Sequence, residues 1–351
     1  MRKINRRVVS AFLTIAIVMS MFSYTLSAGA TSVAGKYKVY TSLGDSNAAG
    51  YATTGYIDNR LPAPEAYKTK VANALQAELR DFGTGGYRTN EIRYMIDPDY
   101  AMDWSYAEIC QGQVHKSQLD EYKDDYIKAV EDADVLTILI GSNDFFGDTF
   151  GTAFAQLYMP VEKLEEIKAK VDGETDFGAK VLTVIDELDS IVKVINFVTT
   201  LLSLLSDKYD EFQENWDAII ERIYEMNPDV QIVAISPINS FNNTKLSEDS
   251  TVDFVAFFFD MILARFQNYI RFLSPYAKTY YYCDITDIKL GELAFTDPDI
   301  MSKYLPLVHH TDEGHTEIAN RVVELLETEG KSQSKKITPA AMFALAWEAI
   351  D

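Results

Sequence analysis

The residues best suited to covalent chemistry are a serine, an asparagine and a cluster of histidines, each beside a turn. Ser46 lies in "KVYTSLGDSNAAGY" (38–51), where an apolar-alternating run stops at Gly44-Asp45-Ser46. A serine that follows a strand, on a turn that opens a helix, has its hydroxyl raised above the sheet edge, near the unpaired backbone donors of that helix. This placement suits a nucleophile, although a Gly-Asp-Ser turn that only caps a helix accounts for the same residues.

A serine nucleophile also needs donors that stabilise the oxyanion of a tetrahedral intermediate. Asn143, in "GSNDFF" (141–146), follows an apolar run and can present its side-chain amide at the same edge of a sheet as Ser46. Turn chemistry alone also favours asparagine at such a position. Asn143 is therefore a candidate donor whose role depends on the rest of the site.

The base that accepts the serine proton must come from four histidines. His115 lies in an ordinary polar stretch, whereas His309, His310 and His315 lie together in "LVHHTDEGHTEIAN" (307–320). Three histidines and two acids this close also suggest a metal site, but their spacing lacks a recognisable ligand frame. We therefore interpret the cluster as the source of a base.

These residues must be positioned by strands that end at a common edge. Five segments resemble buried strands followed by helical pattern: "KVYTSLG" (38–44), "LRDFGTG" (79–85), "DVLTILIG" (134–141), "DVQIVAIS" (229–236) and "TYYYCDI" (279–285). Near-continuous apolar runs that alternate with helices predict a parallel sheet covered on both faces. The expected fold class is α/β, with active groups at the carboxyl ends of the strands.

Two helical insertions interrupt this order. The first spans about residues 150–210 and contains "IVKVINFVTTLLSLL" (191–205), which is apolar almost all round. A helix buried between other helices is the favoured interpretation, because Lys193 and Asn196 would be costly in lipid. A lid over an apolar site and a membrane-touching element are the alternatives. The second insertion spans residues 250–273.

The end of the chain and the cysteines complete the organisation. A helical stripe covers residues 312–330, and a polar linker with a short helix is expected over 331–351. Cys110 and Cys283 are the only cysteines, too few for a disulfide-stapled framework. They fit either one disulfide bond or two buried thiols.

The first thirty residues have the pattern of a targeting signal. Four basic residues precede the apolar run 8–22, and Ala28-Gly29-Ala30 supplies the small residues that a signal peptidase needs. We expect a signal peptide over residues 1–30 and an exported protein. An uncleaved anchor is the alternative, although a membrane span needs ~20 residues.

Charge narrows the range of partners. Removing residues 1–30 takes away four of the 32 basic residues and none of the 53 acidic ones, so the net charge goes from −21 to −25. Such a surface repels nucleic acid and anionic lipid headgroups. We expect no nucleic-acid partner, and membrane contact through the apolar insertion is not favoured.

Four segments together resemble the sequence blocks of the SGNH hydrolases, also called GDSL esterases or lipases. They are "YTSLGDSNAAGY" (40–51), "GGYRTNEIRYMID" (85–97), "LIGSNDFF" (139–146) and "HHTDEGHTEIAN" (309–320), in the order and rough spacing of that family. The resemblance covers about residues 37–330, with 150–210 as an insertion. It implies a flavodoxin-like three-layer α/β/α fold with a mostly parallel five-stranded sheet, and ester hydrolysis through an acyl-enzyme.

The resemblance also implies the roles of the site residues. Ser46 matches the nucleophile, and its backbone N–H would be one oxyanion donor. Gly86 matches a second backbone donor, with Gly85 as a near alternative, and Asn143 matches the third donor. The implied chemistry requires no metal or organic cofactor.

The last block departs from the family pattern. Alignment on Gly314-His315 makes His309 the catalytic base, but Pro306 stands three residues before it, where the family has an acid. The literal pair of Asp312 and His315 is the alternative, although it would lie inside the helix start, where Asp312 looks more like a cap. A Ser-His pair oriented by a backbone carbonyl can still work, because the acid fixes the tautomer and stabilises the imidazolium. Two earlier acids are further candidates for that role, Asp297 and Asp299.

The sequence thus predicts an exported serine esterase or lipase. Its expected partner is a small-molecule or polymer-linked acyl ester, with acetylated polysaccharide and lipid esters as the main candidates, and a thioester is not distinguished from them. The alternative from another class is a family member that has lost catalysis and serves as a surface binding module. The missing acid favours that alternative, whereas Ser46, Gly86, Asn143 and a nearby histidine favour the enzyme.

Overall fold

The computed structural model describes most of the chain that the sequence assigns to the hydrolase domain. The described residues are 32–104, 116–145, 191–238, 244–245, 260–288, 290, 293–294, 309–332, 341–342 and 344–345. The expected signal peptide, Cys110 and Asp297 lie outside them, as do Asp299 and Pro306. Export, a disulfide bond and the domain boundaries therefore stay predictions.

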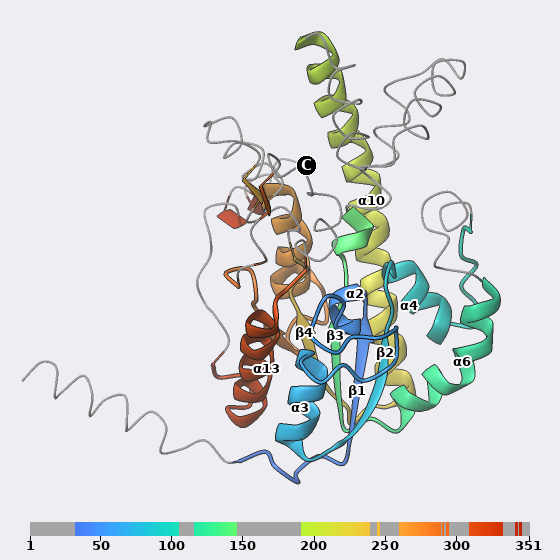
Figure 1. The fold of residues 1–351 in the computed structure, drawn as a ribbon. Coiled ribbons are helices and arrows are strands. Elements are labelled where there is room, and N and C mark those ends of the chain that lie inside the picture. Colours follow the sequence, from blue (N-terminus) through green and yellow to red (C-terminus); the bar gives the residue numbers. More distant parts are fainter. Residues whose placement is uncertain are drawn as a thin grey trace, which may run out of the picture.

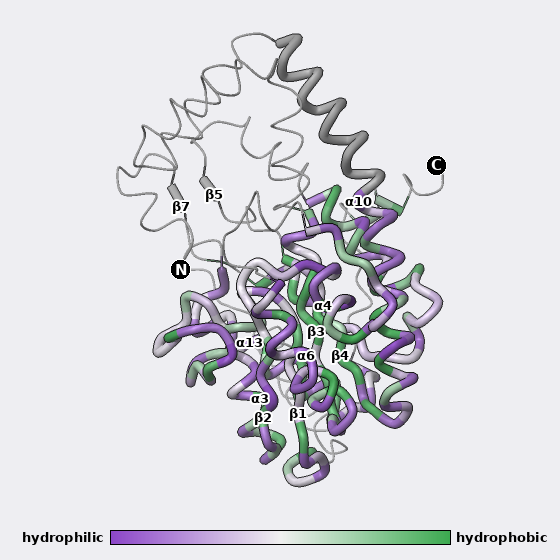
Figure 2. Tube along the Cα trace, turned by 90° about the vertical axis from the view of Figure 1, so that its right-hand side faces the viewer, coloured by the Kyte–Doolittle hydropathy of each residue, from purple (hydrophilic) through white to green (hydrophobic). Residues whose placement is uncertain are grey.

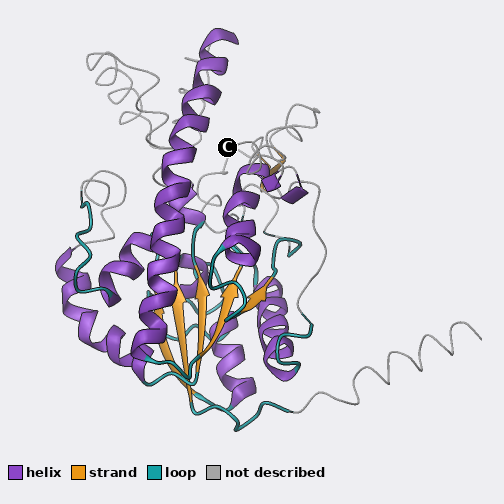
Figure 3. Ribbon diagram, turned by 180° about the vertical axis from the view of Figure 1, so that it is seen from behind, coloured by secondary structure: helices purple, strands orange, loops and turns teal. Residues whose placement is uncertain are grey.

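Five parallel strands form the central sheet (Figures 1 and 3). Their bounds are β1 (Val39–Gly44), β2 (Glu78–Gly83), β3 (Val135–Leu139), β4 (Gln231–Ile235) and β6 (Tyr281–Cys283), in the order β2-β1-β3-β4-β6. All four neighbouring pairs are parallel, which confirms the predicted sheet. With the strands counted in chain order, this is the doubly wound order of a flavodoxin-like fold, with its crevice beside β1 and β3.

Alternation along each strand explains why helices cover both faces of this sheet. Ile232 and Ala234 of β4 join one buried cluster, whereas Val233 and Ile235 join the other. Successive side chains of a strand point to opposite faces, so a strand that is apolar throughout needs a layer on each side. Figure 2 shows the hydrophobic strands inside and hydrophilic segments around them.

The helices form two layers. α3 (Tyr67–Leu75) and α13 (Asp312–Glu327) share one buried cluster with the sheet. The other face is covered by α4 (Thr89–Ile96), α6 (Lys116–Glu131), α10 (Ile191–Met226) and the helical residues 260–268, which continue into the π-helical η2 (Tyr269–Leu273). This arrangement is a three-layer α/β/α sandwich, as expected.

Helix α10 is longer than the apolar segment that predicted it. It runs without interruption to Met226, and its second half packs into the core through Phe212 and Trp216. Its first half extends beyond the carboxyl edge of the sheet (Figure 1). The side chains of 191–207 lie outside the described residues, so the choice between buried helix, lid and membrane contact stays open. No helix in the described ranges is both long and apolar enough to cross a membrane.

Smaller elements lie beyond the main sheet. Two short strands, β5 (Thr244–Lys245) and β7 (Leu293–Ala294), pair in parallel, which the sequence did not predict. The second insertion is helical where it is described. The expected C-terminal helix is described at 341–342 and 344–345, where Asn268 donates from Nδ2 to the Ala341 carbonyl at 3.0 Å. Ala341 and Ala344 therefore contact the helical residues 260–268.

Candidate active site

Ser46 is the first residue of α2 (Ser46–Ala49), a single turn that follows β1 directly. Gly44 allows this turn because its φ is +144°, and a Cβ on it would lie 2.1 Å from the Leu139 carbonyl oxygen. Asp45 caps the turn by accepting the Asn47 N–H at 2.9 Å. The Ser46 N–H has no acceptor among the described residues, as expected of a first-turn donor.

His309 lies beside this serine. The distance from His309 Nε2 to Ser46 Oγ is 2.7 Å, a hydrogen bond between residues that are far apart in sequence. Tyr51 packs against the imidazole, with ring centroids 4.8 Å apart at 51°. The structure therefore brings together the serine and the histidine that the four sequence blocks select.

The other two histidines of the cluster contact different residues. His310 Nδ1 lies 3.3 Å from Asn47 Oδ1. The consecutive residues Ser46 and Asn47 thus contact the consecutive histidines His309 and His310. His315 is fully buried, accepts the Tyr67 N–H on Nδ1 at 3.1 Å and stacks on the Tyr67 ring. His315 thus faces α3 and makes no hydrogen bond with Ser46.

Asp312 is not the N-cap of α13. Thr311 takes that position, with its hydroxyl accepting the Gly314 N–H at 3.3 Å. Asp312 is the first helical residue, and its Oδ1 accepts the Thr54 N–H at 2.9 Å. Because a threonine hydroxyl caps as well as a short carboxylate, the sequence could not separate these adjacent positions. Asp312 instead holds the loop that follows α2.

The candidate oxyanion donors come from the two strands next to β1. Gly86 has φ +81°, and its N–H has no acceptor among the described residues. Gly85 differs, because its N–H donates to Asn59 Oδ1 at 2.9 Å. Asn143 donates one amide hydrogen to the Tyr87 carbonyl at 2.9 Å, which fixes the amide and leaves its second hydrogen for another acceptor. Of the two glycines that the sequence offered, Gly86 is the one whose donor is available.

Burial raises the pKa of two carboxyl groups near the site and lowers the pKa of two histidines. Burial raises the pKa of Asp45 to about 7, against the hydrogen bonds that it accepts from the α2 backbone. It also raises the pKa of Asp144, beside Asn143, to about 7. Burial lowers the pKa of His310 to about 3, with a smaller contribution from His309, and lowers that of His315 well below its usual value. His310 and His315 are therefore neutral at ordinary pH.

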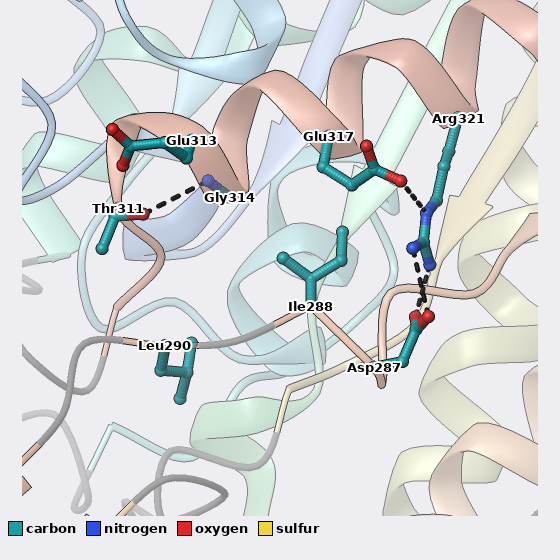
Figure 4. Close-up of a pocket in the computed structure, with 8 residues that line it drawn as sticks. All are labelled: Asp287, Ile288, Leu290, Thr311, Glu313, Gly314, Glu317 and Arg321. Carbon is teal, nitrogen blue, oxygen red and sulfur yellow. Dashed lines mark hydrogen bonds and ion pairs between the residues drawn. The ribbon is translucent and has the colours of Figure 1, made fainter. Parts of the chain in front are cut away.

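A hollow lies beside the histidine cluster, along the first turns of α13. Within the described ranges, no group of three or more histidine, cysteine or acidic side chains could hold an ion. The hollow has a volume of about 330 Å³ and lies between α13 and the segment 287–290 (Figure 4). Arg321 lines it and pairs with Asp287 and Glu317, and neither Ser46 nor His309 borders it.

Several residues of the site carried no sequence signal. Tyr51, Asn59 and the contact between Asn47 and His310 depend on pairs of residues that are distant in sequence. Lys68 is fully buried and contacts the last residue of α2, although lysine is usually exposed.

Comparison with known proteins gives one family. A sequence model of the GDSL-like lipase/acylhydrolase family matches residues 42–316. Similar solved structures include an extracellular lipase from Streptomyces rimosus, at 14% identity over 83% of this chain and 99% of that chain, with a TM-score of 0.45. A phospholipase A1 from Streptomyces albidoflavus NA297 has 14% identity over 83% and 99%, with a TM-score of 0.43. A family two carbohydrate esterase from Clostridium thermocellum has 12% identity over 83% and 64%, with a TM-score of 0.34. No curated protein sequence matches the chain.

Proposed function

The chain belongs to the GDSL-like lipase/acylhydrolase family, and from this premise we propose that it is an exported serine esterase or lipase that hydrolyses acyl esters through an acyl-Ser46 intermediate. The observation that carries the proposal is the distance of 2.7 Å between Ser46 Oγ and His309 Nε2. A general base must lie within about 2.6–3.2 Å of the proton that it takes, and His309 does.

In the acylation step, His309 Nε2 takes the hydroxyl proton while Ser46 Oγ attacks the ester carbonyl carbon. The carbonyl π electrons move onto oxygen and give a tetrahedral oxyanion. When this intermediate collapses, the bond to the alcohol oxygen breaks and His309 returns its proton to that oxygen. The alcohol leaves, and the acyl group remains on Ser46.

In the deacylation step, His309 takes a proton from water while the water oxygen attacks the acyl carbon. The second tetrahedral intermediate collapses by breaking the bond to Ser46 Oγ, which recovers the proton from His309. The products are the carboxylic acid and the free serine. Every proton that His309 accepts is returned, so the cycle needs no cofactor.

Three donors stabilise the oxyanion in this proposal: the N–H groups of Ser46 and Gly86 and the second amide hydrogen of Asn143. They are fixed before substrate binds, because the first two belong to backbone turns and the third is anchored on the Tyr87 carbonyl. Preorganised donors of this kind cost no reorganisation in the transition state.

A second candidate function is a catalytically impaired protein that binds its target at a surface. Pro306 stands where the family's acid is expected, and that observation favours this alternative. An imidazole without the acid still acts as a base when another group fixes its tautomer. The packing of Tyr51 on His309 restrains the orientation of the imidazole, which is the other task of the acid, and this supports the enzyme.

Hydrolysis of p-nitrophenyl esters from acetate to palmitate tests the proposal, with Ser46→Ala as the matched variant. We expect activity in the unmutated protein and a loss of at least about 10⁴-fold in the variant. The chain-length profile separates an acetylesterase from a lipase. A protein that hydrolyses none of these esters and does not react with a fluorophosphonate at Ser46 would favour the binding module.

A further inference from the structure

Lys68 is a fully buried lysine between two segments of the candidate active site. Its ammonium donates to the carbonyl of Ala49, the last residue of α2, at 2.7 Å. The same nitrogen pairs with Asp81 Oδ2 at 2.5 Å, and the two side chains are 0% and 4% exposed. Asp81 in turn accepts the Gly83 N–H on Oδ1 at 3.2 Å. One charged pair therefore bonds to the backbone of both α2 and the end of β2.

The two segments that Lys68 joins carry different parts of the site. Ala49 ends the single turn that begins at Ser46, and Gly83 ends the strand that leads to Gly86. These segments also touch directly, since a Cβ on Gly83 would lie 2.3 Å from the Ala49 nitrogen. The charged pair lies at this contact, between the turn that carries Ser46 and the segment that leads to Gly86.

Stability alone gives no reason for a charged pair here. Moving two charges out of water costs several kcal/mol per ion, and well-packed apolar residues of similar volume often stabilise a protein as much or more. Burial lowers the pKa of Lys68 and raises that of Asp81, and each partner opposes the shift of the other. What the charged pair adds over an apolar pair is a set of directed hydrogen bonds to two backbone segments.

We propose that Lys68, held by Asp81, is a positioning residue that fixes the Ser46 hydroxyl relative to the Gly86 N–H. The inference rests on the proposed hydrolysis, in which the oxyanion is bonded from both segments. A misplacement of a few tenths of an ångström weakens these bonds in the transition state more than it weakens substrate binding. The expected signature is a lower kcat with an unchanged KM.

The double variant Lys68→Met/Asp81→Asn tests this role. Methionine fills the space of the lysine stem but has no hydrogen-bond donor. The amide oxygen introduced at position 81 still accepts from the Gly83 N–H. Because both new side chains are neutral, no unpaired charge is left in the core. We expect kcat to fall about tenfold or more with KM within about twofold. The rate at which a fluorophosphonate labels Ser46 should fall by the same factor, because that reaction uses the same nucleophile and donors.

A matched control removes another largely buried pair outside the site. Arg271 and Asp284 lie 3.5 Å apart, with side chains 10% and 14% exposed. Arg271→Met/Asp284→Asn should lower the melting temperature while leaving kcat within about twofold. If it lowers kcat as much as the Lys68 double variant does, the effect of Lys68 is one of general stability and the inference is wrong.

Two further outcomes separate the inference from the proposed function. An active unmutated protein whose Lys68 double variant keeps its kcat would overturn the positioning role alone. An unmutated protein that neither hydrolyses esters nor is labelled at Ser46 would overturn the proposed function, and the inference with it. Should the double variant fail to fold, Asp81→Asn alone tests the same contact, with an expected two- to fivefold loss of kcat that an unchanged kcat would contradict.

Discussion

The two sides of the candidate active site are held in place by different kinds of contact. On the nucleophile side, Ser46, Gly86 and Asn143 each follow the carboxyl end of one of three adjacent strands. Backbone pairing of β1 with β2 and β3 sets the register of the strand ends, and the Lys68–Asp81 pair connects the segments that follow β1 and β2. On the base side, side chains connect α13 and the residues before it to the rest of the site: His310 to Asn47, Asp312 to Thr54 and His315 to Tyr67.

This difference decides what a substitution does. On the nucleophile side, replacing Ser46 or Asn143 removes a reacting group or a donor, while the paired strands keep the strand ends in register. On the base side, a replaced side chain also loosens the segment that carries His309. The electrostatics differ as well, because burial raises the pKa of the carboxyl group of Asp45 and lowers the pKa of His310.

The largest expected effect is that of Ser46→Ala, on the nucleophile side. The variant loses the attacking oxygen, and we expect kcat/KM for p-nitrophenyl esters to fall by about 10⁴–10⁶-fold. The melting temperature should change by no more than a few degrees, because β1 and the Asp45 cap remain. Ester hydrolysis and thermal unfolding measured on the same preparation check both parts. Substantial residual activity would place the nucleophile elsewhere.

His309→Ala should have the next largest effect, and His315→Ala is its contrast. Loss of the base predicts a fall in kcat of about 10³–10⁴-fold with KM little changed. His315→Ala removes a buried ring and its bond to the Tyr67 N–H, so it should cost about 2–4 kcal/mol of stability. Its kcat, measured well below the melting temperature, should stay within about tenfold.

Equal losses of kcat in these two histidine variants would show that the activity of His309 depends on the contact between His315 and Tyr67. A larger loss in His315→Ala than in His309→Ala would move the base to the pair of Asp312 and His315.

Raising the pH should remove the contribution of Asp45 to stability, on the nucleophile side, whereas lowering the pH should remove that of His310, on the base side. The pKa of Asp45 is about 7 in the folded protein and 3.8 ordinarily, so folding binds a proton between those values. Its contribution to stability is full below pH 4 and is lost as the pH rises through 7, by at most roughly 4 kcal/mol. Asp45→Asn keeps the cap. Between pH 4 and 7, its free energy of unfolding, measured with urea, should fall less than that of the unmutated protein.

His310→Asn is the opposite case for the same measurement. The folded pKa of about 3 lies below the ordinary 6.5, so the contribution of His310 is present above pH 6.5 and lost on acidification. Asparagine keeps an N–H donor near the Nδ1 position, and the variant should tolerate acid better than the unmutated protein. Parallel pH profiles for both variants would contradict the electrostatic contrast.

Asn143→Ala tests the oxyanion donors. Removing one such donor costs about 10²–10³-fold in kcat in serine hydrolysis. The bond to the Tyr87 carbonyl is lost as well, so Asn143→Asp, which has a similar shape but donates no amide hydrogen when ionised, is the companion variant. Both should lower kcat far more than they raise KM. A variant with an unchanged kcat would remove Asn143 from the donor set.

A smaller effect than that of Asn143→Ala is expected of Asn47→Ala, on the base side. The substitution removes the acceptor that faces His310 Nδ1 and leaves a buried imidazole donor unpaired, which costs about 1–3 kcal/mol. Because His309 is the preceding residue, we expect kcat to fall about three- to tenfold. Steady-state kinetics with a short-chain ester measures this effect. An unchanged kcat would mean that His309 does not depend on the His310 contact.

The sequence placed Ser46 and Asn143 at strand ends, as the structure has them, but did not decide between the histidines, and the reason is physical. Strand pattern and turn residues are local signals, and they led directly to Ser46 and Asn143 at strand ends. These local signals could not decide between Gly85 and Gly86. That choice depends on Asn59 Oδ1, which accepts the Gly85 N–H from a loop distant in sequence.

On the base side, spacing alone could not decide between His309 and His315. His309 lies just before α13 and His315 lies in its first turn. The contact that separates them is the Tyr67 N–H, 248 positions away in the chain. Lys68 and Asp81 are the extreme case, because each looks like an ordinary exposed charge in its own element. Only the packing of α3 against α2 and β2 makes them a buried pair.

Activation of Ser46 by His309 can be measured through the rate at which a fluorophosphonate labels Ser46. The rate should be read by mass spectrometry of the peptide that contains Ser46, in the unmutated protein, His309→Ala and His315→Ala. We predict rapid labelling of the unmutated protein, labelling of His315→Ala within about tenfold, and a loss of about 10³-fold or more in His309→Ala. Equal labelling of the unmutated protein and His309→Ala would show that His309 does not activate Ser46.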